Sequence, residues 1–316
     1  MTLLRIFVVG EALVDVVPPA AGQPARARPG GSPANVAVGL ARLGIPATLA
    51  TGLGADEHGR LVAAHLAEAG VTMLNRAAGE GPTSVATVSF DASGEPGYDF
   101  TLSWEIGSVV LPTDAIALHT GSLAAALAPG RFEVDAVMAR AGAAGVTVSY
   151  DPNIRPALLA DRMRERTRVD RQVAHADLVR ASAADLAWLY PGSDPVAIAN
   201  RWLTGRPALV VITRGELGCV ALTAAGMITV PARPVRVVDP VGAGDAFTAA
   251  LLAGLYGAGR LGDGWPAGGV APTELTGILT AAATAAALTC ARPGADPPTA
   301  AELNRALAAP DIDGSP

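Results

Sequence analysis

Short runs of apolar residues alternate with longer mixed segments along most of the chain. Five of the runs have the length and the Val, Ile, Leu and Ala content of buried strands: 6–9, 47–51, 146–150, 178–180 and 209–213. Five of the segments between them are predicted as helices: 34–43, 57–69, 134–144, 185–190 and 196–203. Because strand and helix alternate, the pattern predicts an α/β fold with a mostly parallel sheet and helices on both of its faces.

Local signals mark the ends of several helices. Ser32 followed by Pro33 is typical of an N-cap with proline at the first helical position, and Gly44 ends that helix. Asp56 is expected to cap the next one. Beyond these, the sequence predicts a hairpin and two long helices, at 219–222 with 228–230, at 245–256 and at 274–289.

Two stretches interrupt this alternation. Leu13–Val17, Thr83–Phe90 and Tyr98–Trp104 are predicted as strands with turn-rich joins, and no helix is expected between the last two. We therefore expect a small, partly antiparallel sheet outside the main one, from lid segments at approximately 11–30 and 83–105. No internal repeat or linker is found, so residues 1–316 are expected to form one domain.

The composition excludes several classes of protein. Half of the 316 residues are apolar, which allows a sizeable core, and the net charge of −6 argues against a nucleic-acid surface. All 23 cationic side chains are arginines. Without a lysine the chain cannot contain the phosphate-binding loop G-x-x-x-x-G-K-[ST].

The expected location is the cytoplasm. Met1–Val17 lacks the long apolar core and cleavage pattern of a signal peptide. The uncharged window between Glu274 and Arg292 is predicted to be a buried helix, so no membrane contact is expected. Cys219 and Cys290 lie in apolar runs and are expected to be buried free thiols, as in a reducing compartment.

The segment Asp239–Thr248 carries the most specific chemistry. It follows the apolar run Val235–Val238, crosses Gly242 and Gly244, and enters a predicted helix. Asp245 therefore lies in a first helical turn, beside bare amides that can hold a phosphate or a developing anion. An acid in that position can take a proton from an attacking hydroxyl. The pairing predicts phosphoryl transfer to an alcohol.

Other polar residues follow predicted strands, where open α/β sheets bind ligands. Asp15 could accept bonds from two sugar hydroxyls, although a solvated strand-end acid explains it as well. Gly30 and Gly31 with Asn35 form a capped glycine turn or place an amide beside a polar ligand. Asp151–Arg155 is either a rigid polar corner of a site or a loop salt bridge, and the two interpretations are level.

Two further loops have a structural and a functional interpretation. Thr213–Gly218 is a hairpin turn or a backbone nest for phosphate. Ser182 is explained as a helix N-cap, and Asp185 could act through water on a magnesium ion. The four histidines lack metal-ligand spacing, and the serine-hydrolase elbow and the dinucleotide-binding G-x-G-x-x-G are both absent.

Taken together, these residues resemble the ribokinase-like (PfkB-type) carbohydrate kinases over roughly residues 4 to 306. The matching motifs follow the family's order: Gly10-Glu11 with Asp15, 30–37, 51–56, 151–155, 213–215, 239–247 and Gly294-Ala295. The first glycine cluster and Gly-Ala-Gly-Asp at 242–245 are the family's two signatures. The resemblance implies a three-layer α/β/α fold with a mostly parallel central sheet and a small β-sheet lid.

The resemblance also implies a role for each matching residue. Asp245 is the expected catalytic base, and the amides of Gly242, Ala243 and Gly244 the expected anion hole. The expected sugar contacts are Asp15, Gly30, Gly31, Asn35, Tyr98, Phe100, Asn153 and Arg155. The expected nucleotide-side residues are Arg180, Asp185, Thr213, Gly215 and Gly218. Asp239, the carbonyl of Val241, and Gly294 match the loops of a monovalent-cation site.

The resemblance implies ATP, Mg²⁺ and K⁺ as cofactors and a homodimer formed through the lid. Asp151–Pro156 and Tyr98-Asp-Phe100 look most like segments of bacterial fructokinases, so fructose is the expected acceptor. The alternatives are a kinase for 2-keto-3-deoxygluconate, ribose or a nucleoside, or a non-catalytic sugar- or nucleotide-binding regulator. The chain departs from the family at Arg180, where many relatives have lysine, and at Asp185, where the family has the longer glutamate.

Overall fold

The main sheet of the protein has nine strands among the residues that the computed structural model describes, which are 4–17, 26–77, 81–90, 96–159, 161–265 and 269–309. Its strands are β1 (Arg5–Val9), β4 (Ala47–Thr51), β5 (Thr72–Asn75), β8 (Ala115–Gly121), β9 (Thr147–Asp151), β10 (Leu178–Ser182), β11 (Leu209–Thr213), β12 (Cys219–Thr223) and β13 (Gly226–Val230). The order is β13-β12-β11-β10-β9-β8-β1-β4-β5. All neighbouring pairs from β11 through β1 to β5 are parallel. At the other end, β12 and β13 form a hairpin that pairs antiparallel with β11.

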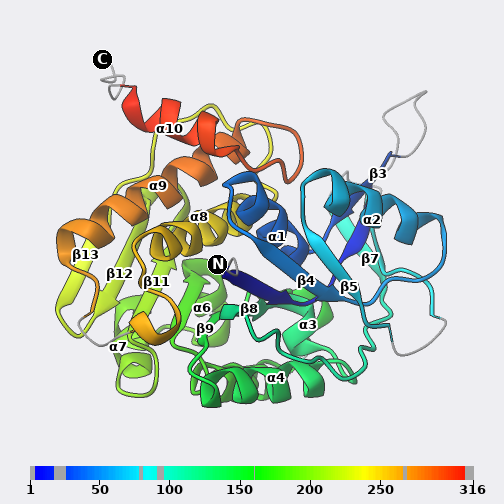
Figure 1. The fold of residues 1–316 in the computed structure, drawn as a ribbon, viewed down its shortest axis with the longest axis horizontal. Coiled ribbons are helices and arrows are strands. Elements are labelled where there is room, and N and C mark those ends of the chain that lie inside the picture. Colours follow the sequence, from blue (N-terminus) through cyan, green and yellow to red (C-terminus); the bar gives the residue numbers. More distant parts are fainter. Residues whose placement is uncertain are drawn as a thin grey trace.

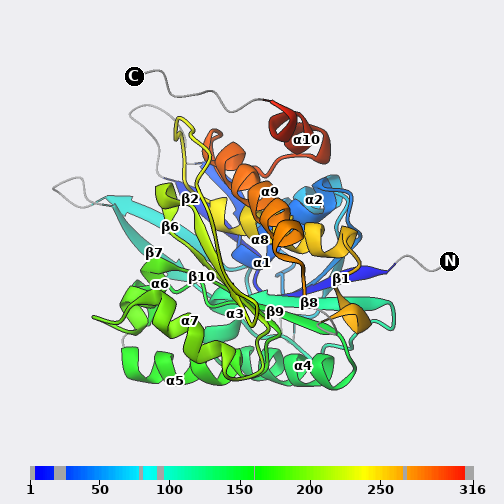
Figure 2. The same cartoon turned by 90° about the vertical axis from the view of Figure 1, so that its left-hand side faces the viewer.

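Helices cover both faces of this sheet, which confirms the three-layer α/β/α prediction (Figures 1 and 2). One layer contains α1 (Ser32–Arg42), α2 (Glu57–Glu68), α8 (Ala243–Gly257) and α9 (Pro272–Cys290). The other contains α3 (Ser122–Ala126), α4 (Arg131–Ala143), α5 (Arg162–Val173), α6 (Ala183–Leu189) and α7 (Pro195–Leu203). Helix α10 (Ala300–Ala308) packs on the outside of α9.

A second, four-stranded sheet extends beyond the main one in Figure 2. It has the order β3 (Arg26–Gly30), β2 (Leu13–Val17), β6 (Val85–Phe90) and β7 (Pro96–Thr101). The inner pair β2–β6 is parallel and the two outer pairs are antiparallel. The predicted small, partly antiparallel sheet is therefore present, with strands inside the two expected segments.

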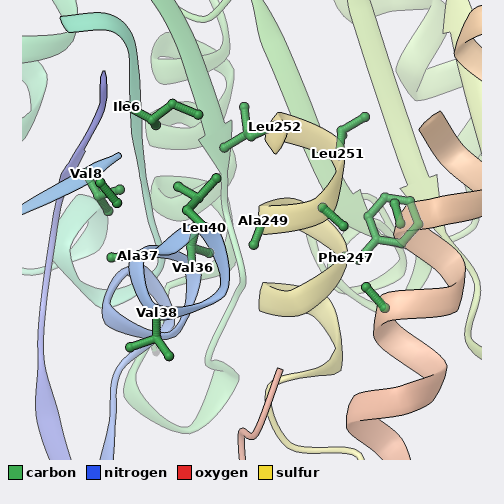
Figure 3. Packing of buried hydrophobic residues seen from close by; sticks show 14 of the residues in the cluster. Ile6, Val8, Val36, Ala37, Val38, Leu40, Phe247, Ala249, Leu251 and Leu252 are labelled. Atoms are coloured by element: carbon green, nitrogen blue, oxygen red, sulfur yellow. The ribbon is translucent and has the colours of Figure 1, made fainter. Parts of the chain in front are cut away.

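The core is divided by the main sheet because side chains of a strand alternate between its faces. In β1, Ile6 and Val8 join one buried cluster, and Phe7 and Val9 join the other. Figure 3 shows the first cluster, in which residues of α1 and α8 such as Leu40, Ala249 and Leu252 face one another. This contact places the beginnings of both helices at the same edge of the sheet.

Strand β8 and helix α5 were not predicted from the sequence. Strand β8 is rich in alanine, which has a weak strand preference, and it is held by its neighbours β1 and β9. Helix α5 has the sequence RMRERTRVDRQV, and its buried face includes Glu165, Arg168 and Gln172 beside Val169. Its interior contacts are polar, so hydrophobic periodicity does not reveal it. Strands β3 and β5 and helices α3 and α10 were also missed.

Helix α9 is the one helix within the described ranges that is long and apolar enough to cross a membrane by these two criteria alone. It packs against α8 and α10, and Leu275, Leu279 and Ala282 belong to the core cluster. These contacts agree with the predicted buried helix.

The close contact of α1 with α8 gives a test of the packing. A Cβ atom on Gly39 would lie 2.6 Å from the Cβ of Ala249, whereas one on Gly277 in α9 would meet nothing within 4 Å. We expect Gly39→Ala to lower the free energy of unfolding by about 1–3 kcal/mol through overpacking. The matched change Gly277→Ala should raise it by about 0.5–1 kcal/mol because alanine favours helix. Urea denaturation measures both, and equal effects would contradict the proposed contact.

Candidate active site

Asp245 lies in the first turn of α8, behind a sharp turn made by Gly242. Gly242 is the N-cap residue with φ of 77°, and a Cβ there would lie 2.4 Å from the Cβ of Ala295. Glycine is thus required by both the backbone conformation and the space. The amides of Ala243 and Gly244 begin the helix, where an anion can accept their hydrogen bonds. In the structure the amide of Ala243 makes a long bond of 3.3 Å to the carbonyl of Pro240.

The carboxylate of Asp245 is buried and accepts hydrogen bonds from the first turn of α1. Ser32 Oγ donates to one oxygen at 2.7 Å, and Asn35 Nδ2 donates to the other at 2.8 Å. The N-cap prediction for Ser32 was wrong, because Gly31 with φ of 101° is the N-cap residue and makes no side-chain bond. Ser32 is a site residue that the sequence argument missed. Its spacing of three from Asn35 on one helix is the signal that could have found it.

The loop after β9 is joined to the same network. Asn153 Nδ2 donates to Ser32 Oγ at 2.8 Å, and Arg155 donates to Asn153 Oδ1 at 2.5 Å. Asn153 has φ of 37°, a conformation that asparagine tolerates better than most residues. Asp151 forms its ion pair with Arg180 on β10 and not with Arg155, so the structure does not show the predicted salt bridge between the ends of this loop. The role of the loop in a binding site stays a prediction.

Asp15 approaches this network from the small sheet. A Cβ on Gly30 would lie 2.2 Å from Asp15 Oδ2, so glycine makes room for that carboxylate. Burial raises the pKa of Asp15 to about 6, Arg155 lowers it and Asp245 raises it further. Asp15, Arg155 and Asp245 come from different elements, and each is close enough to affect the charge of Asp15.

The register of the small sheet places Phe100 in the same row as Asp15. Asp15 pairs with Ala86 and Ala86 pairs with Phe100, so the three side chains share one face. Tyr98 in β7 pairs with Val88 in β6, and the side chain of Tyr98 lies outside the described residues.

The predicted nucleotide-side loop follows β11. Gly218 has φ of 78°, and a Cβ there would meet the carbonyl oxygen of Val230 at 2.1 Å, whereas Gly215, with φ of 57°, has open space around it. Thr213 Oγ1 accepts a bond of 2.6 Å from Arg180 on β10, which also pairs with Asp151 on β9 at 2.9 Å. The structure thus brings the ends of three neighbouring strands together.

Asp185 has a structural role. It forms a capping box with Ser182, which confirms the N-cap prediction for that residue. Its Oδ2 accepts bonds from the amide and hydroxyl of Ser182, and its Oδ1 accepts one from the amide of Ile154 at 2.9 Å. Asp185 therefore anchors the loop that contains Asn153. Its action on magnesium stays a prediction.

Asp239 joins the two loops that were expected to hold a monovalent cation. Its carboxylate accepts bonds from the amide of Val241 at 3.0 Å and from the amide of Gly294 at 2.8 Å. Backbone carbonyls of these loops are suitable ligands for a hard cation. No group of three or more His, Cys, Asp and Glu side chains with metal-binding geometry occurs in the part of the chain that the structure describes.

Glu11 is a buried carboxylate that was not among the site residues predicted from the sequence. Its Oε2 accepts a bond of 2.8 Å from the amide of Ala124 in α3, next to Ser122, whose φ is 53°. Burial raises the pKa of Glu11 to about 7, although its hydrogen bonds and Arg155 lower it. An acid directly after the apolar strand β1 was the available signal.

A cavity of about 580 Å³ lies between α5 and the segment that joins α3 to α4, and it is separate from these residues. It is lined by Arg131, Arg164, Arg168 and neighbouring apolar side chains, and none of the predicted site residues lines it.

Comparison with known proteins agrees with the geometry. Residues 3–302 match the family described as pfkB family carbohydrate kinase. A fructokinase of Klebsiella pneumoniae is 37% identical over 260 residues, which cover 79% of this chain and 84% of the relative.

Two similar solved structures are bound to ligands. A fructokinase from Xylella fastidiosa with bound ATP has a TM-score of 0.85 and 27% identity, over 96% of this chain and 98% of that one. A double mutant of fructokinase from Vibrio cholerae O395 in its fructose-, ADP- and potassium-bound form has a TM-score of 0.80 and 28% identity, over 96% and 98% of the chains.

The raised pKa of Glu11 predicts a pH dependence of stability. Between pH 4.5 and 7 the folded protein holds a proton that an unfolded glutamate releases, so this residue makes the protein less stable as pH rises. In wild type the free energy of unfolding should decrease as pH rises through this window. Glu11→Gln should make that decrease smaller, by up to about 1.4 kcal/mol per pH unit. Urea denaturation at several pH values measures it.

Asp56→Asn is the control for this experiment. The pKa of Asp56 is held at about 2 by hydrogen bonds from Thr83 and Gly59, which outweigh its burial. Loss of the Asp56 carboxylate should change the free energy of unfolding without changing how steeply it depends on pH between pH 5 and 7. If Glu11→Gln also left this pH dependence unchanged, the raised pKa of Glu11 would be contradicted.

Proposed function

We propose that this chain, which belongs to the pfkB family of carbohydrate kinases, transfers the γ-phosphoryl group of ATP to a hydroxyl of fructose. The chain is a phosphotransferase with a sugar hydroxyl as acceptor. The observation that carries the proposal is the buried carboxylate of Asp245 at the first turn of α8, held by Ser32 and Asn35 beside the amides that begin the helix.

In this proposal Asp245 is the general base. It removes the proton of the attacking hydroxyl, a contribution of roughly 10²–10⁴ in rate. The amides of Gly242, Ala243 and Gly244 stabilise charge on the transferred group, and one such donor is worth about 2.7–4 kcal/mol. The bonds from Ser32 and Asn35 fix the carboxylate before the substrate arrives, so little reorganisation is needed at the moment of transfer.

The sugar is proposed to bind between the small sheet and the main sheet. Asp15 and Asn153 offer acceptor and donor groups for its hydroxyls, and Arg155 offers a cation. Gly30 and Gly31 leave room for this approach, and Phe100 lies in the same row of the small sheet as Asp15. The small sheet acts as a lid that excludes water, and Tyr98 is proposed to belong to it.

ATP is proposed to bind along the loop after β11, where Thr213, Gly215 and Gly218 lie. Magnesium would neutralise charge on the phosphates, with Asp185 acting through water and Arg180 from the strand before it. Asp239, Val241 and Gly294 would hold potassium, and the potassium ion named for the Vibrio cholerae fructokinase supports this choice.

We further propose a homodimer formed through the lid and a cytoplasmic location. Among the described residues β3 and β7 are the outer strands of the small sheet, and outer strands are where a sheet can bind another strand. Cys219 and Cys290 are free thiols, as expected in a reducing compartment. Light scattering after size-exclusion chromatography tests the dimer, and a single mass of about 32 kDa would contradict it.

A coupled ADP-release assay tests the choice of acceptor. With fructose, 2-keto-3-deoxygluconate, ribose and adenosine as acceptors, we expect the highest kcat/KM for fructose and faster turnover with potassium than without. A higher value for another acceptor would move the protein to a different kinase of this fold. No turnover with any acceptor would support the non-catalytic regulator.

Asp245→Asn tests the base. The amide keeps the size of the side chain and one acceptor for Asn35, so binding of ATP and fructose by calorimetry should stay within about threefold while kcat falls by 10²-fold or more, roughly the lower end for general bases. The control is Asp194→Asn, which exchanges one good N-cap residue of α7 for another and should leave kcat unchanged. Turnover of Asp245→Asn within tenfold of wild type would exclude Asp245 as the base.

A further inference from the structure

Arg180 is a buried residue in the middle of β10, and its side chain lies between the ends of β9 and β11. Its side chain is 8% exposed, and it forms a 2.9 Å ion pair with Asp151 on β9. Its second terminal nitrogen donates to Thr213 Oγ1 on β11 at 2.6 Å. Its Nε has no hydrogen-bond partner among the residues that the structure describes. One guanidinium therefore connects the loop on the sugar side with the loop on the nucleotide side.

The same guanidinium also contacts the beginning of α8. A Cβ placed on Gly244 would lie 2.9 Å from both terminal nitrogens of Arg180 and 3.2 Å from its Cζ. Such short distances mean that the group fills the space where a side chain at position 244 would stand. Gly244 has an ordinary helical backbone, so this contact, and not its conformation, is what requires glycine there.

Several titratable groups face this cation. Asp151, Asp185 and Asp245 all raise the pKa of Arg180, which opposes the effect of its burial. In return, Arg180 lowers the pKa of Asp151, which burial raises to about 6. Arg180 also acts on two neutral buried neighbours, His119 on β8 and Cys219 on β12. A buried cation among three carboxylates is costly to remove or to shorten.

We propose that Arg180 is a positioning residue for the anion hole: it holds the Gly242–Asp245 segment at a fixed height above the ends of β9 and β11. The inference rests on the proposed function, because it concerns the segment assigned to phosphoryl transfer. Arg180 acts through Gly244, Asp151 and Thr213, so that the base and the amides keep one arrangement relative to both substrate loops.

The shape of the guanidinium explains why lysine is not equivalent here. Two separate nitrogens reach two strands, while the flat group lies against Gly244. A lysine amine is a single point on a flexible stem, so it can keep only part of this arrangement, but it can also move aside. Arg180→Lys should therefore lower kcat about tenfold and change KM for ATP and sugar less than threefold.

A double-mutant cycle tests the contact with Gly244. Gly244→Ala alone should lower kcat about 100-fold, the size of losing one oxyanion donor, and should lower Tm. In the Arg180→Lys background the same change should cost at least tenfold less in kcat and less in Tm, because the new amine can leave the space. Equal costs in both backgrounds, in kcat and in Tm, would overturn the proposal.

A second pair of variants separates positioning from simple charge balance. Arg180→Met leaves Asp151 buried without its cation and should lower both Tm and kcat. Adding Asp151→Asn removes that charge and should restore Tm, while kcat stays at least 30-fold below wild type. Recovery of kcat to within threefold of wild type together with Tm would overturn the proposal.

The two hypotheses fail in different ways. If the wild type turns over no sugar, the proposed function fails, and the Tm cycle still shows whether Arg180 and Gly244 are in contact. If the wild type turns over a sugar and the variants show no coupling, the inference about Arg180 fails alone.

Discussion

The site depends on the hydrogen bonds that connect the first turns of α1 and α8. Ser32 and Asn35 reach Asp245 across more than 200 positions of the sequence. A buried carboxylate needs such donors, because without them the cost of removing it from water is not compensated. The bonds form only if both helices begin at the same edge of the sheet, which the packing of Leu40, Ala249 and their neighbours ensures. The hydrogen bonds at Asp245 therefore depend on the packing of α1 against α8 in the core.

The parallel sheet concentrates charge at the same edge. Asp151 and Thr213 end β9 and β11, and Arg180 on the strand between them bonds to both, so side chains that are far apart in sequence become neighbours. Burial raises the pKa of Asp15, Asp151 and Glu11, and nearby donors and arginines limit each shift. The chain has no lysine, and guanidinium groups supply the fixed positive charge. Their planar shape lets one side chain serve several partners.

Part of this arrangement could be predicted from the sequence. The fold class and the positions of most of the main-sheet strands follow from apolar runs, and the candidate base Asp245 follows from two glycines before a helix. The helix α5 could not be predicted, because its buried Glu165, Arg168 and Gln172 satisfy one another and leave no apolar stripe. Ser32 was taken as a cap because capping is local, whereas its true partner is distant in sequence. The contact of Arg180 with Gly244 likewise appears only after β10 and α8 are placed.

The position of Gly31 has a thermodynamic consequence. It separates Asp15, in the small sheet, from Asn35, in a helix of the main body, and it has φ of 101°, where its close approach to the backbone of Glu11 leaves no room for a side chain. A sugar bound as proposed contacts both parts. Its apparent dissociation constant then equals the intrinsic value divided by the fraction of molecules in which the two sheets are aligned. Substitutions at this junction can weaken sugar binding without touching the sugar.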